Sequence, residues 1–229
     1  MSKKKVRRKI KVIPMIITLL IISFLLFILF YLLSLPTRNI FIVGNDLLSD
    51  QVIIDQSGLS NYPSFYLHTR MGISKRIKKI DLIENVKVRR KFFNVFEIEV
   101  IEKEILFKDS SNNYILKDGT SLNHNYGNLD IPILLNYVSD IVFPRFIENY
   151  AKIERDVRSR ISEIKYDPSE YDQNRFLLAM NDGNYVYINL ASLELLKHYD
   201  NIYASLEGNK GIIYCDSSYS ETCSFQKFP

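Results

Sequence analysis

"IFIVGNDLLSDQVIIDQSGL", residues 40–59, is the stretch that decides the fold of the first half of this chain. A short apolar run is followed by Gly44-Asn45, a pair that is typical of a turn. Ser49 is a good helix N-cap, and Gly58 is a good C-terminal stop. The stretch therefore predicts a strand, a turn and a short helix.

The residues that follow predict a second helix and a two-stranded hairpin. Residues 69–80 place three isoleucines on one helical face and four basic residues largely on the other. Residues 85–91 and 95–104 alternate apolar and charged side chains, as half-buried antiparallel strands do, with 92–94 as their turn. The order strand-helix-helix-strand-strand predicts a three-stranded sheet with both helices on one face.

An uncharged apolar segment, residues 12–35, lies upstream of this unit. As a helix, its 24 residues can cross a hydrocarbon core of about 30 Å. A cleavable signal peptide is the alternative, but such peptides have a shorter apolar core and a small-residue cleavage site, which "LLSLPTRN" lacks. Seven basic residues precede the segment, so we expect a cytoplasmic tail at 1–11 and an extracytoplasmic remainder.

The net charge of +4 combines two different regions. From Arg38 onward the chain carries 23 basic and 26 acidic residues, a net charge of −3. A nucleic-acid-binding domain needs a basic face that neutralises phosphates, so nucleic acid is not an expected partner. The basic side of residues 69–80 has two interpretations, a solvated helix face or a contact with anionic membrane lipid.

From Ile105 onward the pattern changes to short strands and hairpin turns. Asp118-Gly119 and Asp182-Gly183 mark two turns, where glycine supplies a positive φ and aspartate tolerates one. The predicted elements are strands around these turns at 113–122 and 174–190, a strand at 131–138, helices at 143–161 and 191–206, and final strands at 211–216 and 221–228. We expect an antiparallel sheet with helices on one face, in a chain that is α+β as a whole.

The residue patterns predict neither a catalytic site nor a metal or cofactor site. His68, His124 and His198 have no second ligand at the spacing that a metal site needs. Nucleophile-elbow, zinc-protease and phosphate-loop motifs are absent from the sequence. Cys215 and Cys223 fall on two final strands, where they form either a cross-strand disulfide or two free thiols.

The order of motifs resembles the FtsQ/DivIB family of bacterial cell-division proteins, and its first part resembles a POTRA domain. The residues that carry the resemblance are Val43-Gly44-Asn45, Ser49 with Ile53, Ser57-Gly58-Leu59, Ile83, Val86, Val88, Arg90, Ile98, Val100 and Glu102, followed by the Asp118-Gly119 and Asp182-Gly183 turns. Two positions depart from the family pattern: Phe93 stands where a proline is common, and Lys103 replaces an arginine.

The resemblance implies a non-enzymatic, bitopic scaffold of the division machinery at the septum. It divides the chain into the tail 1–11, a transmembrane helix 12–35, a POTRA domain 38–107 and a β domain 108–229. It also implies partners: short single-pass coiled-coil proteins of the FtsB/DivIC and FtsL type, and a septal penicillin-binding transpeptidase. An unpaired terminal edge strand offers backbone groups that a partner strand can complete. The partner-binding residues expected from this are Glu221, Thr222, Ser224 and Phe225 at the edge, and Ile212, Ile213 and Tyr214 on the strand beside it.

Three alternatives stay open from the sequence. One is a POTRA-containing accessory of secretion or transport. Another is a membrane-anchored cell-wall enzyme, which needs a convergent catalytic site. The last is a lipid-surface sensor that uses the basic helix at 69–80.

Overall fold

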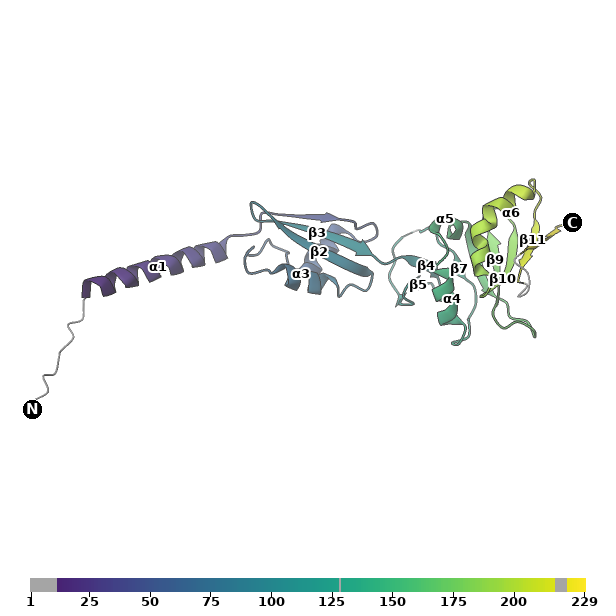
Figure 1. Ribbon diagram of the computed structural model, residues 1–229, viewed down its shortest axis with the longest axis horizontal. Coiled ribbons are helices and arrows are strands. Elements are labelled where there is room, and N and C mark those ends of the chain that lie inside the picture. The colour runs from purple at the N-terminus through teal and green to yellow at the C-terminus, as the bar shows by residue number, and fades with distance from the viewer. Residues whose placement is uncertain (1–11, 128, 217–221) are drawn as a thin grey trace, which may run out of the picture. The chain divides into compact units, whose positions relative to one another are not determined.

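A computed structural model of the chain describes residues 12–127, 129–216 and 222–229. It divides into two compact units, Met1–Glu102 and Lys103–Pro229 (Figure 1). The sequence places this boundary after residue 107. In the structure the residues just before that point form strand β4, Ile105–Lys108, which belongs to the sheet of the second unit.

The first unit follows the predicted order of strand, helix, helix, strand and strand after a long apolar helix. Its elements are α1 (Val12–Ser34), β1 (Asn39–Val43), α2 (Asp50–Ser57), α3 (Arg70–Ile77), β2 (Ile83–Lys91) and β3 (Val95–Glu102). The predicted α+β fold with one N-terminal apolar helix is confirmed. Helix α1 is 23 residues long, or about 34 Å, and none of its residues is buried.

Local signals in the sequence explain where the two short helices begin and end. The Ser49 hydroxyl accepts a hydrogen bond from the Val52 backbone N–H, which caps α2. The Thr69 hydroxyl caps α3 in the same way, accepting from the Gly72 N–H. Gly58 ends α2 in the left-handed conformation, with φ of 73°, where a side chain would be unfavourable.

The sheet of the first unit has the order β1-β3-β2, with β3 parallel to β1 and antiparallel to β2. Its helix-covered face buries Phe96 and Ile98 together with Ile73 and Ile77 of α3. On the outer face basic residues of β2 pair with acidic residues of β3, as the alternation predicts. The pairs are Arg89–Glu97, Arg89–Glu99 and Lys91–Glu97, at 3.0–3.2 Å.

Arg76 does not belong to the solvated basic side of α3, where the sequence pattern places it. Its Nε donates to the Ser57 carbonyl oxygen at 2.5 Å, and its guanidinium packs against Gly58. This contact joins α3 to the end of α2. The remaining basic residues of this region, Lys75, Lys78 and Lys79, lie at the surface.

The second unit is built on one sheet of nine strands in the described residues, in the order β12-β11-β10-β9-β8-β7-β4-β5-β6. After β4 its elements are β5 (Tyr114–Leu116), β6 (Ser121–Leu122), β7 (Ile133–Leu134), α4 (Phe143–Tyr150), α5 (Arg155–Arg158), β8 (Ile161–Tyr166), β9 (Arg175–Met180), β10 (Tyr185–Asn189), the 3₁₀ helix η1 (Leu193–His198), α6 (Tyr199–Ser205), β11 (Gly211–Cys215) and β12 (Ser224–Lys227).

This sheet is mixed, whereas the sequence predicts an antiparallel one. Strand β7 runs parallel to both β4 and β8, and β10 runs parallel to β11. Parallel neighbours need a crossover connection. The helices between β7 and β8, and those between β10 and β11, provide two of these crossovers.

Each of the two helices predicted for the second unit is replaced in the structure by shorter elements. The apolar stripe at 143–161 divides into α4, α5 and the start of β8, because Ile153 and Val157 reach the same core from a turn and a one-turn helix. The stripe at 191–206 begins as the 3₁₀ helix η1. Leu193, Leu196 and Tyr199 are all buried at a spacing of three, which is the period of a 3₁₀ helix.

The core of the second unit lies between the sheet and these helices. Phe146 of α4 stacks on Phe176 of β9 with ring centroids 4.3 Å apart. Alternate residues of β9 are buried, and the residues between them are partly exposed. The helices therefore cover one face of the sheet, and the other face remains accessible.

Candidate functional site

Strand β12 forms one edge of the nine-stranded sheet, and all four of its residues are exposed. It pairs antiparallel with β11, with Phe225 opposite Ile213. Among the described residues, no strand pairs with its outer side. The edge is therefore available to a further strand.

The hydrogen-bond pattern fixes which backbone groups of β12 face outward. The Phe228 N–H donates to the Lys210 carbonyl oxygen at 2.9 Å, so these two residues form a hydrogen-bonded pair. In an antiparallel ladder such pairs alternate with non-hydrogen-bonded ones. Ser224 and Gln226 therefore point their N–H and C=O groups at β11, and Phe225 and Lys227 point theirs outward.

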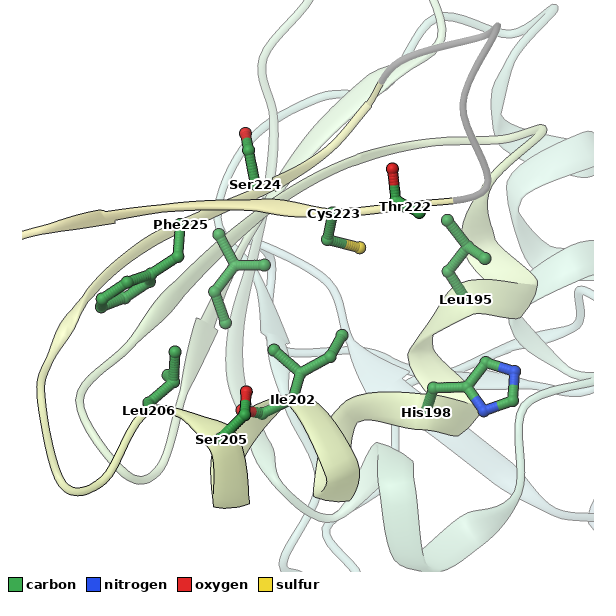
Figure 2. A pocket seen from close by; sticks show the side chains of 10 residues that line it. Leu195, His198, Ile202, Ser205, Leu206, Thr222, Cys223, Ser224 and Phe225 are labelled. Carbon is green, nitrogen blue, oxygen red and sulfur yellow. The ribbon is translucent and has the colours of Figure 1, made fainter.

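An apolar pocket of roughly 360 Å³ lies between β12 and the helices η1 and α6. Leu195, Ile202 and Leu206 line its helix side, and Ile213 lines its floor. Figure 2 shows Phe225 and Cys223 pointing from the strand toward the helices, whereas Ser224 and Thr222 point to the other side. The edge thus offers a backbone ladder and an adjoining apolar recess.

Two structural links hold β12 in place. A disulfide joins Cys215 at the end of β11 to Cys223 just before β12, with the Cα atoms 4.4 Å apart. Gly211, at the start of β11, allows close approach of the two strands. A Cβ atom there would lie 2.1 Å from the Gln226 carbonyl oxygen and 2.7 Å from the Phe225 ring, so only glycine fits.

The Asp182-Gly183 turn positions β11 and α6 rather than forming a carboxylate site. The Asp182 carboxylate accepts from the Tyr199 hydroxyl at 2.6 Å and from the Asn184 N–H at 3.0 Å. The buried Asn184 side chain accepts from the Gly211 N–H at 2.9 Å. Burial and the Asp182 carboxylate raise the pKa of Tyr199, which keeps its hydroxyl protonated as a donor.

The residues expected to bind a partner fall into distinct environments. Ile213 is only 1% exposed and belongs to the core, so it contributes to the floor of the pocket rather than to the open surface. Ile212 and Tyr214 point to the helix-free face, where Tyr214 donates to Gln226 at 3.1 Å. Ser224 and Phe225 belong to the edge strand itself, and Thr222 lies at the pocket rim. Glu221 lies outside the described residues.

The helix residues of the pocket are not among those predicted from the sequence. Leu195, His198, Ile202 and Leu206 recur at spacings of three or four on η1 and α6. That spacing is a detectable signal, but it indicates a core face equally well. Only the position of β12 shows that part of this apolar stripe borders the sheet edge.

The Gly44, Asn45 and Glu102 motif residues of the first unit form a single cluster. The Glu102 carboxylate accepts from the backbone N–H groups of Leu47 and Leu48, both at 2.9 Å. The Asn45 side chain donates to the Leu48 carbonyl oxygen at 2.8 Å. Gly44 has φ of 87°, and a Cβ there would lie 2.3 Å from the Val100 carbonyl oxygen. The motif therefore fixes the loop before α2 against the end of β3.

The Asp118-Gly119 turn joins β5 to β6 and contacts the start of the second unit. Lys103 Nζ lies 2.6 Å from the Asp118 carboxylate, which also accepts from the Thr120 N–H at 3.0 Å. Burial raises the pKa of Asp118, but the hydrogen bonds from Lys103 and Thr120 outweigh it and lower that pKa to about 2.

The three histidines lie in separate surroundings. His68 bonds to the Ser64 carbonyl oxygen, His124 packs against Tyr126, and His198 borders the pocket. Within residues 12–127, 129–216 and 222–229, no group of three or more His, Cys, Asp or Glu side chains could hold a metal ion. Among the described residues, the exposed edge strand β12 with its adjoining apolar pocket is therefore the best candidate for a functional site.

Comparison with known proteins gives the family. Residues 35–103 match the family model described as POTRA domain, FtsQ-type. Cell division protein DivIB of Listeria monocytogenes is 29% identical over 92% of this chain and 82% of its own length. DivIB of Bacillus subtilis is 27% identical over 93% of this chain and 85% of its own length.

The chain is also similar to a solved structure, the major extracytoplasmic domain of the trans isomer of DivIB from Geobacillus stearothermophilus. The match covers 46% of this chain and 95% of the chain in that structure. It is 22% identical, with a TM-score of 0.39. Each of the two DivIB sequence matches covers more than nine tenths of the chain and therefore extends into both units. Among the described residues, α1 is the one helix that is long and apolar enough to span a membrane. The protein is a single-pass membrane protein with a POTRA domain, and it belongs to the FtsQ/DivIB family of bacterial cell-division proteins.

Proposed function

We propose that this protein is a non-enzymatic scaffold of the divisome that binds partner proteins through its two outer units. The observation that carries the proposal is the exposed edge strand β12 beside an apolar pocket. A partner strand can hydrogen-bond to the outward groups of Phe225 and Lys227, while an apolar partner side chain enters the pocket. Backbone pairing supplies affinity, and the pocket supplies selectivity.

The proposed partners of this edge are short single-pass coiled-coil division proteins of the FtsB/DivIC and FtsL type. The septal penicillin-binding transpeptidase and other septal proteins are proposed to contact the complex, with the POTRA domain contributing to recruitment. Partners anchored in the same membrane have a raised effective concentration, so a four-residue edge strand is sufficient for assembly.

The proposed orientation has residues 1–11 in the cytoplasm and both units on the outer side, at the division septum. Seven basic residues before α1 support it, because basic residues flanking a span stay in the cytoplasm. The domains proposed are the tail 1–11, the span 12–35, a POTRA domain that begins at residue 38, and a β domain that ends at residue 229 and includes strand β4.

A pair of substitutions at one position tests the edge-strand mechanism. Lys227→Pro removes an outward N–H but no bond to β11, since proline is tolerated on the free side of an edge strand. Lys227→Ala is the matched control, because it removes the same side chain and keeps the N–H. Each full-length variant is expressed in its native membrane, crosslinked and isolated, and the captured FtsB/DivIC-type protein is quantified.

We expect Lys227→Pro to lose capture and Lys227→Ala to retain it. Thermal unfolding of both variants checks that the second unit is intact. Equal capture by the two variants would show that the outward N–H of Lys227 is not used, and the edge-strand mechanism would be rejected.

A further inference from the structure

The membrane-proximal end of the first unit carries a group of exposed apolar side chains that its fold does not explain. We call this the tip surface and define it as Tyr62, Tyr66, Leu67, Phe92 and Phe93. Phe92 and Phe93 are the most exposed of the five, at 89% and 79%. They form the turn between β2 and β3, together with Asn94.

Folding alone does not call for aromatic residues at these turns. Phe93 has φ of 62° and Tyr62 has φ of 49°, in the left-handed region that bulky side chains rarely adopt. Asparagine or glycine would occupy such positions at lower cost. Because the Phe93 side chain is largely exposed, burial within the unit does not offset this cost.

Hydrogen bonds tie the tip surface to the end of the membrane-spanning helix. The Asn94 side chain donates to the Pro36 carbonyl oxygen at 3.2 Å, and the Arg38 N–H donates to the Asn94 carbonyl oxygen at 2.9 Å. The Phe65 N–H donates to the Leu35 carbonyl oxygen at 2.9 Å. Both segments of the tip surface are therefore attached within a few residues of Ser34, where α1 ends.

The strand directions place the same end of the sheet toward the membrane. Strands β1 and β3 run parallel, with Asn39 opposite Val95, so β3 begins where the chain leaves the helix. Pro36 lies two positions after Ser34 in the sequence, and two positions span at most about 7 Å. The headgroup region on each side of a bilayer is roughly 5–8 Å thick, so the tip lies at the level of the lipid headgroups.

The charges around the tip surface suit a membrane that carries anionic lipid. Residues 57–80 and 86–94, which contain all five tip residues, include no acidic residue. Tyrosine and apolar side chains are favoured at the interface, and anionic headgroups repel carboxylates.

We propose that the tip surface inserts into the outer interface of the bilayer and holds the POTRA domain against the membrane next to α1. The occupant of this surface is the lipid bilayer itself. The proposal rests on α1 spanning the membrane and is independent of partner binding at β12.

The absence of tryptophan from the chain provides a direct test. Full-length protein with Phe93→Trp is reconstituted into vesicles of phosphatidylcholine and phosphatidylglycerol, with and without brominated acyl chains. Tyr31→Trp in α1 is the inserted reference. Tyr171→Trp in the second unit, at a residue that is 97% exposed, is the water-exposed reference.

We expect brominated lipid to quench Phe93→Trp to an extent close to that of Tyr31→Trp, with blue-shifted emission. Tyr171→Trp should show neither effect. Emission of Phe93→Trp that matches the water-exposed reference and resists quenching would overturn the proposal. Absence of quenching for Tyr31→Trp would overturn the proposal as well, because α1 would then not span the bilayer. Failure of the partner-binding proposal is distinguished from this result because it is measured separately, by capture with the Lys227 variants.

Discussion

Reduction of the Cys215–Cys223 disulfide should loosen the edge strand by a predictable amount. The two cysteines are 8 residues apart, so reduction frees a short loop in the unfolded chain. The loop-entropy relation gives about 8 cal/mol/K for this length, or about 2.5 kcal/mol at 25 °C. Reduction should lower the free energy of unfolding of the second unit by that amount, and it should weaken partner capture because β12 loses its covalent link to β11.

A single-tryptophan reporter, Tyr203→Trp on α6, follows unfolding of the second unit alone, since the chain has no other tryptophan. Urea unfolding is measured with and without dithiothreitol. With a slope of about 2 kcal/mol/M, the midpoint should fall by about 1 M on reduction. A Cys215→Ala/Cys223→Ala variant should not respond to the reductant. A midpoint that changes by less than about 0.2 M in the parent protein would refute the reasoning.

Three further predictions concern residues that stabilise one unit or the other from within. Gly211→Ala should destabilise the second unit by about 1–3 kcal/mol and reduce partner capture, because its Cβ would lie 2.1 Å from the Gln226 carbonyl oxygen; unchanged urea unfolding would contradict this. Glu102→Ala should lower the stability of the first unit by about 2–3 kcal/mol, since it leaves the Leu47 and Leu48 N–H groups without their acceptor; an unaltered melting temperature would exclude that role. Because the folded-state pKa of Asp118 is lowered from 3.8 to about 2, its contribution is present above pH 4 and is lost as the pH falls toward 2. With a side chain that is 45% exposed, the effect is screened to about 1 kcal/mol or less, and Asp118→Asn should remove it from the pH profile of unfolding.

The elements of the first unit could be predicted because each carries a local signal. Ser49 and Gly58 mark the ends of α2, and the charge alternation in β2 and β3 marks their shared outer face. The function of Glu102 could not be predicted in this way. Its partners, the N–H groups of Leu47 and Leu48, are about 55 residues away in the sequence and become neighbours only through the sheet.

The second unit was harder to predict because its parallel pairings depend on long connections. Strand β7 has only two residues, yet it lies between β4 and β8 in the middle of the sheet. The spacing of Leu193, Leu196 and Tyr199 indicated a helix but not its 3₁₀ form.

Part of the edge could be predicted from the position of Phe225 near the end of the chain. The burial of Ile213 could not be, since a one-residue shift in register would have placed it on the opposite face. The pocket beside the strand could not be predicted either, because it requires η1 and α6 to lie beside β11 and β12.

Hydrogen exchange at individual amides of β12 tests the central claim most directly. Full-length protein is compared alone and in complex with its FtsB/DivIC-type partner. We predict that the Ser224 and Gln226 amides are protected in both states, because they bond to β11. The Phe225 and Lys227 amides should become protected only in the complex. If a saturating amount of bound partner leaves exchange at Phe225 and Lys227 unchanged, the partner does not pair with this edge, and the account of the site is contradicted.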